Sequence, residues 1–574
     1  MWLLLREKIN RMNWIIEENT EESIINLLSK ELNVDPIISS MLVNRGIKSF
    51  EQAKDFFRPN LNQLHDPFLM KDMDIAVSRI VSAIENKESI MVYGDYDVDG
   101  TTAVALLTSY LKETGGIVST YIPDRISEGY GISLKAIDTA SNNNQGLIIA
   151  LDCGIKANAQ VAYASSKGID FIICDHHNPS KLIPDALAIL NPKRSDCNYP
   201  FKDLCGCGVG FKLIQAINLK KGFDIDRIVN YLDLVSLAIA ADIVPLVAEN
   251  RTLAHIGMQI INSNPRMGLH CILKNNVKKE FNIEDLMFYV APRINAAGRI
   301  SHASLSLELL MEKDLIKAEE LSKKIDELNT QRREIEKETT NQALEQIEKL
   351  NDNNKNSTVV FNESWNKGVI GIVASRLIEK YYRPTVVFCK SGDGNLTASA
   401  RSIKNIDLYK ILESCDKYIL QFGGHKYAAG LTIKEEDLSN FKNNFEEEVS
   451  NYTGNKLLEE EIIIESKIKL DSITPKFFRI LSQFEPFGPG NKTPNFVSDH
   501  LSIEGKINKV GKNKEHIKVS VKQSSQNIFP AIGFWLSEKF KTIDSEKFFS
   551  MVYCIDQNTW NGKTTIQLKI KDVK

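Results

Sequence analysis

Residues 93–100, YGDYDVDG, place Asp95, Asp97 and Asp99 on alternate positions before a glycine. Carboxylates this close repel one another, which raises their pKa values and weakens a fold unless a cation lies among them. The preceding residues, ESIMVYG, form an apolar run typical of a buried strand, and the residues after Gly100 have helical spacing. We therefore expect the aspartates at a strand-to-helix turn, where open α/β sheets bind ligands.

A calcium loop is the first alternative, because a helix–loop–helix calcium site begins with the same D-x-D-x-D-G pattern. Its twelfth position requires a bidentate Glu, and counted from Asp95 that position is Leu106. The loop would also have to follow a helix, whereas a strand pattern precedes it. The sequence therefore favours a metal site of another type.

The length and composition describe a multidomain globular chain. Its 574 residues suggest roughly three or four domains. No apolar run approaches the roughly 20 residues that cross a membrane, and MWLLLREK at the start is too short for a secretory signal. Nine scattered cysteines, including the CGCG pair Cys205 and Cys207, indicate reduced, structural thiols. These features predict a cytoplasmic protein without a membrane partner.

Charge is distributed unevenly along the chain. The net charge is −3, but residues 497–574 carry 13 Lys and 8 Asp or Glu, a local +5, which leaves −8 for the first 496 residues. This predicts a carboxylate-rich site upstream and a basic module downstream. Charge combined with stacking is how small barrels hold single strands. The candidate residues there are Lys506, Lys509, Lys512, Lys514, Lys518, Lys522, Phe534 and Trp535.

The hydrophobic patterns predict several regions. Apolar runs alternate with helical patterns between residues 85 and 245, which predicts βαβ units around a parallel sheet. Beyond residue 455, five short alternating segments suit an oligonucleotide-binding barrel, with any other small barrel or sandwich as the alternative. We expect an appended segment at 1–60, a catalytic domain at 61–312, a long connecting helix at 313–352, a smaller α/β domain at 353–455 and the barrel at 456–574.

Four apolar runs end in acidic residues, and we interpret all four as strands. Besides the opening stretch they are LIIALDCG, FIICDHH and LVSLAIAADIVPL, which carry Asp152, Asp175 with His176 and His177, and Asp242. The C-terminal ends of parallel strands share one edge of a sheet, so these side chains should converge on one crevice. A single Asp after a strand more often caps a helix, but four such runs together predict a site.

Carboxylates mixed with imidazole suit manganese, iron or zinc, and a site this rich in oxygen favours Mn²⁺ or Mg²⁺. Two ions about 3.5–4 Å apart that share a carboxylate can activate a water and stabilise charge on a phosphoryl group. Other hydrolytic motifs are missing. NGKT at 561–564 lacks the first glycine of a P-loop, and neither G-x-S-x-G nor H-E-x-x-H occurs.

The motif DHH at 175–177, together with GDYDVDG, DCG and AADIVPL, resembles the DHH phosphoesterase family. GGHKYAAG at 423–430 resembles the associated C-terminal domain of that family. IPDRISEGYG, LCGCGVGFKL, PRINAAGR, GVIGIVASRL and FEPFGPGN narrow the resemblance to its RecJ branch of bacterial single-strand-specific exonucleases, over residues 60–574. The resemblance implies an α/β fold with a DHH-type parallel-sheet catalytic domain, a long connecting helix, a smaller DHH-associated α/β domain and a C-terminal OB-type β-barrel.

The resemblance also implies roles for individual residues. The ligands of one ion would be Asp99, Asp152, His176 and Asp242, and those of the other Asp97 and the shared Asp152. His177 would contact the scissile phosphate, and Asp95 would support the loop or a ligand water. The opposite wall of the channel would be formed by Gly423, Gly424 and His425. The 5′-terminal phosphate would be bound by Arg125, Ser399 and Arg401, and an internal phosphate by Arg299.

Two positions depart from the family pattern. Some relatives carry a metal-binding His where this chain has Tyr93, which leaves the second ion with fewer protein ligands and dependent on substrate phosphate. After Trp365 the family often has His where this chain has Asn366. No role is therefore carried over to Asn366.

The implied function is a Mn²⁺- or Mg²⁺-dependent exonuclease that degrades single-stranded DNA from its 5′ end to 5′-mononucleotides, in DNA repair and recombination. The resemblance implies a monomer, with a single-strand-binding protein and a helicase as candidate partners. One alternative is a DHH-family enzyme that acts on oligoribonucleotides or pyrophosphate, but the smaller relatives lack the basic β-region. The other is a binding protein with a decayed site, but here every acid and both histidines are present.

Overall fold

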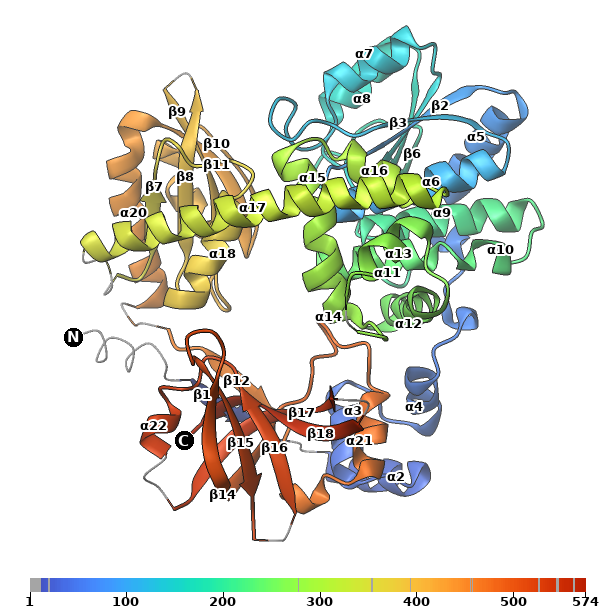
Figure 1. Cartoon of the computed structure of the whole chain (residues 1–574). Helices are drawn as coiled ribbons and strands as arrows, with labels where there is room; N and C mark the ends of the chain where they lie inside the picture. Colours follow the sequence, from blue (N-terminus) through green and yellow to red (C-terminus); the bar gives the residue numbers. More distant parts are fainter. Residues whose placement is uncertain are drawn as a thin grey trace. The chain divides into compact units, whose positions relative to one another are not determined.

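The computed structural model describes residues 12–574 except 19–20, 277, 351, 353–354, 393, 455, 457, 525–526, 544–546 and 561–562. The stretch MWLLLREK, part of the polar break after residue 350 and boundary residue 455 lie outside the described residues. The chain forms two compact units: Leu61–Leu458, and Met1–Asn60 together with Glu459–Lys574 (Figure 1). Within the described ranges, no helix combines the length and the apolar character needed to cross a membrane.

A five-stranded parallel sheet organises the first part of the larger unit (Figure 1). Its order is β3 (Ile117–Tyr121), β2 (Ser89–Gly94), β4 (Leu147–Leu151), β5 (Asp170–Cys174) and β6 (Ala188–Leu190). The central strands are continuous apolar runs that are buried on both faces, as parallel strands between helices should be. One face packs against α5 (Met73–Glu85), α6 (Val98–Glu113) and α9 (Gly206–Lys220), and the other against α7 (Leu134–Asn142) and α8 (Asn158–Ser166).

Helices follow the sheet. They are α10 (Asp226–Val229), α11 (Leu232–Asp242), α12 (Ala248–Ser263), α13 (Met267–Leu273), α14 (Ile283–Asp285), the π-helix η3 (Leu286–Val290), α15 (Ala291–Ile300) and α16 (Ser304–Met311). The prediction of a strand before Asp242 was wrong, because that run is the buried helix α11. A short, wholly apolar run does not reveal its period when every face of the element is buried.

The long connecting helix is α17 (Leu315–Lys349), which confirms the predicted helix with slightly shorter bounds. It packs against α13 and α15 at one end and against β7 (Thr358–Phe361) and α18 (Ile370–Tyr381) at the other (Figure 1). The smaller α/β region has a sheet in the order β10 (Gln421–His425), β11 (Ala428–Lys434), β9 (Asn395–Arg401), β8 (Thr385–Gly392) and β7 (Thr358–Phe361). Its helices are α18 (Ile370–Tyr381), α19 (Leu408–Ser414) and α20 (Leu438–Thr453). GGHKYAAG therefore forms the turn and adjoining residues of the hairpin between β10 and β11.

The second unit contains the predicted barrel. Its strands are β14 (Phe496–Val510), β15 (His516–Lys522), β16 (Ile528–Gly533), β18 (Lys563–Val573) and β17 (Phe549–Trp560), and pairing of β14 with β17 closes it. The short strand β13 (Ser466–Lys467) adds to β14, while α21 (Pro475–Ser482) and α22 (Phe540–Ile543) lie outside the sheet.

The membership of the barrel differs from the sequence prediction. One of the five alternating segments, EIIIESKIKL at 461–470, divides between two sheets. Its first part, β12 (Glu461–Ile464), pairs in parallel with β1 (Asn13–Ile16) in a separate sheet, and its second part contains β13, which pairs with β14 of the barrel. β16 was not predicted as a strand, because Pro530 interrupts its pattern. The pattern therefore indicated the barrel but placed one segment only partly correctly and missed one strand.

Residues before 61 are part of the second unit. The helices α2 (Glu22–Leu32), α3 (Pro36–Asn44) and α4 (Phe50–Phe57) share a hydrophobic core with the barrel, which contains Ile38 and Leu42 as well as Phe484 and Phe496. Arg45 forms an ion pair with Glu465 at 2.7 Å. The predicted domains 1–60 and 456–574 thus share one core, and the individual domain boundaries stay a prediction.

Candidate metal centre

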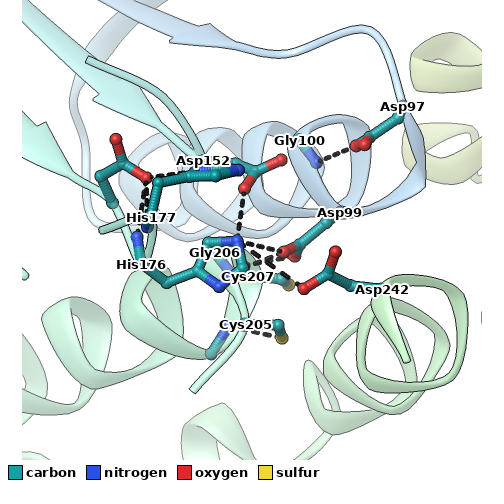
Figure 2. Close-up of polar contacts among 12 residues, drawn as sticks. Asp97, Asp99, Gly100, Asp152, His176, His177, Cys205, Gly206, Cys207 and Asp242 are labelled. Atoms are coloured by element: carbon teal, nitrogen blue, oxygen red, sulfur yellow. Dashed lines mark hydrogen bonds and ion pairs between the residues drawn. The ribbon is translucent and has the colours of Figure 1, made fainter. Parts of the chain in front are cut away.

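The turn between β2 and α6 holds the first aspartates. Asp97 is the N-cap of α6, and its Oδ1 accepts the Gly100 N–H at 3.1 Å. Asp99 lies in the first helical turn and is almost completely buried. Its carboxylate accepts N–H groups from Gly206 at 2.6 Å and Cys207 at 2.7 Å, at the start of α9 (Figure 2). Two helix N-termini therefore hold the carboxylates in place.

Asp152 follows β4 in a left-handed conformation with φ of 61°. Its Oδ1 lies 3.1 Å from Nε2 of His176, which follows β5. His176 Nε2 is also 3.8 Å from Asp99 Oδ2 and 3.7 Å from Asp242 Oδ2. Figure 2 shows the carboxylates of Asp99, Asp152 and Asp242 near this imidazole. The structure thus brings together side chains from β2–α6, β4, β5 and the end of α11.

Asp175 organises the loop after β5 that carries His176 and His177, here called the histidine loop. Its Oδ1 accepts the N–H groups of His176 at 2.7 Å and His177 at 3.0 Å and lies 2.7 Å from His177 Nδ1, while Oδ2 accepts the Ile155 N–H at 2.9 Å. Burial opposes its ionisation, but the contacts with His177 and the backbone outweigh burial and lower the pKa of Asp175 to about 2. Burial likewise lowers the pKa of His177, but Asp175 outweighs it, so the pKa is raised. The pair favours a cationic His177.

Three sets of ligand atoms lie within 4.8 Å of one another in the described residues. They are Asp99, His176 and Asp242; Asp95, Asp97 and Asp152; and Asp152, His176 and His177. The first set contains three of the four ligands predicted for one ion. The second joins Asp97 and Asp152, predicted for the other ion, with Asp95, which was predicted only as a support, and Asp152 also lies 3.1 Å from His176. The predicted bridging position of Asp152 is compatible with this geometry.

The electrostatics of the cluster fit bound cations. Burial, followed by the negative charge of Asp97, raises the pKa of Asp99 to about 7. Burial and neighbouring aspartates also raise the pKa values of Asp95, Asp152 and Asp242 well above their usual range. Burial lowers the pKa of His176 to about 3, which keeps its imidazole neutral and able to ligate.

Several buried polar atoms of the cluster lack hydrogen bonds, which also indicates that cations bind there. Asp95 Oδ1, Asp152 Oδ1 and both ring nitrogens of His176 have none among the described residues. Unpaired buried acceptors beside mutually repelling carboxylates are costly unless a cation engages them. The donor set of carboxylates with one neutral imidazole suits Mn²⁺ or Mg²⁺.

The smaller sheet supplies the facing wall. His425 ends β10, an edge strand, and its ring stacks on His177 with centroids 6.2 Å apart. Gly423 and Gly424 precede it, and a Cβ at Gly424 would lie 2.3 Å from the carbonyl oxygen of Ala428. Gly423 has open space around it. His425 therefore faces the histidine loop, and only Gly424 requires the absence of a side chain.

Two of the predicted arginines, Arg299 and Arg401, lie at the start of α18, and the charge of Arg125 acts on both. Arg299 Nη1 donates to the carbonyl of Gly368 at 2.8 Å, and Arg401 Nη1 donates to Ser399 Oγ at 3.0 Å. Burial and the charges of Arg125, Arg332 and Arg401 lower the pKa of Arg299 to about 9. Burial and Arg125 also lower the pKa of Arg401. Half-buried guanidinium groups whose positive charges lie this close together form a site suited to a polyanion.

The two departures from the family pattern have local explanations. The Tyr93 hydroxyl donates to the Gly131 carbonyl at 2.6 Å, and its ring stacks on Tyr121. Tyr93 therefore ties the loop that carries Arg125 to the sheet. Asn366 Oδ1 accepts the Gly368 N–H at 2.7 Å, which stabilises the turn whose carbonyl contacts Arg299.

Sequence reasoning missed three residues at this site. The hydroxyl of Tyr130 lies 3.1 Å from His177 Nε2, and Asn191 and Lys193 lie beside the histidine loop. Tyr130 belongs to the motif IPDRISEGYG and could have been chosen from it. No pattern marks Lys193, because a lysine after a short strand is ordinary.

The barrel carries the predicted aromatic residues on its surface. Trp535 is 69% exposed and Phe534 45% exposed. Both rings contact His516, with centroid distances of 4.8 and 5.2 Å, and the Lys569 ammonium lies 5.9 Å from the Phe534 ring. Of the predicted lysines, Lys522 pairs with Glu504. The remaining exposed lysines and this aromatic group provide charge and stacking surface.

Family models match three parts of the chain: "DHH family, N-terminal domain" at residues 89–239, "DHHA1 domain" at 354–451 and "RecJ OB domain" at 464–572. The single-stranded-DNA-specific exonuclease RecJ of Bacillus subtilis is 36% identical over 570 residues, covering 98% of this chain and 71% of that protein.

Solved structures are similar over nearly the whole chain. A crystal structure of RecJ from Thermus thermophilus in complex with Mn²⁺ has a TM-score of 0.85 at 25% identity, covering 98% of this chain and 80% of that one. The Mg²⁺ complex of the same protein has a TM-score of 0.79 at 24% identity, covering 98% and 79%. This likeness confirms the expected fold.

Proposed function

Because this chain belongs to the RecJ family of single-stranded-DNA-specific exonucleases, we propose that it degrades single-stranded DNA from the 5′ end and releases 5′-mononucleotides. It is a hydrolase of phosphodiester bonds that requires divalent metal ions. We propose in addition that degradation runs from the 5′ end, that two ions are bound, and that single residues have the roles given below. We also propose that the protein is a cytoplasmic monomer that acts in DNA repair and recombination.

One observation carries the proposal. Carboxylates from three separate chain segments and a neutral imidazole from a fourth form sets of three ligand atoms that lie within 4.8 Å of one another, and several of these buried atoms have no hydrogen bond among the described residues. Such a cluster is unfavourable by itself and becomes favourable when cations bind. The rings of His177 and His425, which stack on each other, lie beside this cluster, where a phosphoryl group would approach it.

We assign Asp99, His176 and Asp242 to one ion, Asp97 to the second, and Asp152 to both. Mn²⁺ or Mg²⁺ bound there would supply a water of lowered pKa and neutralise charge on the phosphoryl oxygens. Asp99 keeps its orientation through the N–H groups of Gly206 and Cys207. Asp95 supports the turn, since its buried carboxylate lies beside Asp97 and Asp152.

We assign the phosphate contact to His177. Asp175 holds the Nδ1 side of its ring, so that Nε2 faces away from Asp175, where the Tyr130 hydroxyl lies 3.1 Å from it. Because Asp175 raises the pKa of His177, the imidazolium can donate to a non-bridging oxygen of the scissile phosphate. His425, whose pKa burial lowers, stacks against it and closes the channel.

We propose that the terminal phosphate binds Arg125, Ser399 and Arg401. Guanidinium groups match phosphate oxygens in pairs, and the N-terminus of α18 lies beside Arg401, because a Cβ at Gly371 would be 3.0 Å from Arg401 Nη2. An internal phosphate was predicted for Arg299. Its nearness to Arg401 and Arg125 instead supports a contact in or next to the terminal pocket.

The test uses the purified chain with Mn²⁺ and four substrates: 5′-labelled and 3′-labelled single strands, duplex DNA and pyrophosphate. Mononucleotides released first from the 5′-labelled end of single strands support the proposal. Preferential cleavage of pyrophosphate or of the 3′ end would contradict it. Asp152→Asn should abolish hydrolysis while the circular dichroism stays unchanged, and retention of more than about a tenth of the activity would refute the metal assignment. A single-strand-binding protein and a helicase, as suppliers of strands, are candidate partners.

A further inference from the structure

A pocket of about 290 Å³ lies beside the carboxylate cluster, on the side of Asp242. Its walls come from the histidine loop, from the residues after α11 and from His425 of the smaller sheet. Lys193 also lines the pocket and is the one Lys or Arg among its described lining residues. It was not among the residues implied by the family motifs.

Hydrogen bonds through Asn191 connect the backbone of Lys193 to the histidine loop. Asn191 is fully buried, its Nδ2 donates to the His177 carbonyl at 2.9 Å, and its Oδ1 accepts the Lys193 N–H at 2.8 Å. On the other side of Lys193, Arg194 is held by Asp72 and Asp196 through ion pairs of 2.6 and 2.7 Å. The backbone of Lys193 is therefore anchored on both sides.

Among the described residues, the ammonium of Lys193 makes no ion pair and no hydrogen bond, whereas the guanidinium of the neighbouring Arg194 makes both. The side chain is only half-buried, so it can reach a molecule in the pocket. A fixed backbone that carries a free ammonium into a pocket of acids and imidazoles is suited to an anion that enters from outside.

The position of Lys193 differs from that of the arginines. Lys193 lines the pocket together with Asp242 and His425. The Arg125 guanidinium lies 4.5 Å from the ring centroid of Tyr96, which stands between Asp95 and Asp97 in the chain. Lys193 therefore lies on the side of Asp242, and Arg125 on the side of the β2–α6 turn.

With the proposed function as its basis, we infer that Lys193 binds the phosphodiester on the 3′ side of the scissile one. A strand whose 5′-terminal phosphate lies among the arginines and whose scissile phosphate lies at the carboxylates continues past Asp242 into this pocket. The Lys193 ammonium is then a second anchor, which only substrates longer than a dinucleotide can engage. Lys193 is a substrate-binding residue in this inference, and Asn191 positions it.

The experiment compares Lys193→Met, which keeps the length of the side chain, with Lys193→Arg, which keeps its charge. Lys202→Met is the matched control, because Lys202 lies in the same loop but donates to the Cys197 carbonyl and does not line the pocket. The substrates are a 5′-phosphorylated dinucleotide, which has only the scissile phosphodiester, and a 5′-phosphorylated dodecamer.

Lys193→Met should raise KM for the dodecamer by about tenfold with little change in kcat, since a charge-assisted contact is lost. KM for the dinucleotide should change less than about twofold, and Lys193→Arg and Lys202→Met should resemble the parent. An equal loss on both substrates would place Lys193 at the scissile phosphate and overturn the inference. An unchanged KM for the dodecamer would also overturn it.

A binding measurement gives a readout that does not depend on turnover. In EDTA, the slope of log Kd against log salt for a single strand should be smaller by about 0.7 for Lys193→Met, the value for one lost phosphate contact, and unchanged for Lys202→Met. An unchanged slope for Lys193→Met would contradict the inference. If the parent failed to cut single strands at all, the proposed function would fail instead, so the two failures are distinguishable.

Discussion

Gly206 passes so close to Asp152 that a Cβ at Gly206 would lie 2.5 Å from the Asp152 Cβ and 2.7 Å from its Oδ1. Gly206 also donates its N–H to Asp99 at 2.6 Å. The start of α9 therefore positions two of the proposed metal ligands, which explains why the motif LCGCGVGFKL has a glycine at this position.

We expect Gly206→Ala to displace Asp152 and to lower the apparent affinity for Mn²⁺ by at least about tenfold, since the contacting Cβ cannot move without the backbone. The matched control is Gly208→Ala in the same helix, where a Cβ would meet Cys205 and Leu204 at ordinary distances of 3.5 Å. Calorimetric Mn²⁺ titration measures the difference. Equal affinities for the two variants would contradict the assignment of Asp152 as a ligand.

The metal-free protein should lose thermal stability as the pH rises from 6.5 to 8. Burial and Asp97 raise the pKa of Asp99 to about 7, and Asp95, Asp152 and Asp242 are also raised. A carboxyl whose pKa is higher in the folded state stabilises the fold below that pKa and loses this contribution as the pH passes it. The raised pKa of His177 also makes the folded state less stable as the pH rises. The lowered pKa of His176 changes the stability only below about pH 6.5, the ordinary pKa of histidine.

Differential scanning calorimetry in EDTA tests this expectation. Each group that changes ionisation contributes up to about 1.4 kcal/mol per pH unit. Asp242→Asn should weaken the dependence on pH, and saturating Mn²⁺ should remove most of it, because bound ions favour the ionised ligands. A Tm of the metal-free protein that rises over this interval would refute the burial of repelling carboxylates.

Arg401→Ala should slow the degradation of 5′-phosphorylated strands about 10- to 100-fold and that of 5′-hydroxyl strands little, because the lost charge-assisted contact of about 1.5–3 kcal/mol exists only with the phosphate. Arg376→Ala is the control, since Arg376 lies on the neighbouring α18 and pairs with Glu336 and Glu379. Single-turnover rates on both substrates measure the effect. Equal slowing on the two substrates would mean that Arg401 holds structure or internal backbone.

Trp535→Ala should weaken binding of single-stranded DNA by about 1–3 kcal/mol, because a base stacks on its exposed ring. The salt dependence of Kd should stay the same, since no charge is removed, whereas Lys509→Met should reduce the slope. Fluorescence anisotropy over a salt series measures both effects. Unchanged binding by Trp535→Ala would exclude this face of the barrel as the DNA surface.

A truncation after residue 455 is not a clean test of the barrel. Ile38, Leu42 and other residues before 61 share a core with residues after 459, so the truncation would expose apolar surface in the remaining chain. Point substitutions on the exposed face avoid this problem. The order of the segments along the chain does not reveal the shared core, because the whole of Leu61–Leu458 lies between the two segments.

Local sequence was sufficient for the strand-to-helix turn at Asp95–Asp99 and for the carboxylates that follow β4 and β5. Apolar runs of strand length define the sheet, and the C-terminal ends of parallel strands share an edge, so convergence follows from topology alone. The run before Asp242 was misread, because a fully buried helix and a buried strand are both continuously apolar. Its carboxylate nevertheless reaches the same cluster, 3.7 Å from His176.

Motifs and periodicity therefore determined the family, the parallel sheet, the long helix and the acidic cluster, because each depends on residues close together in the chain or on a rule of sheet topology. Only the tertiary structure decided that His425 stacks on His177, that Arg125, Arg299 and Arg401 influence one another, and that Lys193 enters the pocket with a free ammonium. These relationships join segments more than 60 residues apart or depend on where a side chain points once its neighbours are paired. Packing of whole elements sets such distances, and no local pattern of residue types encodes them.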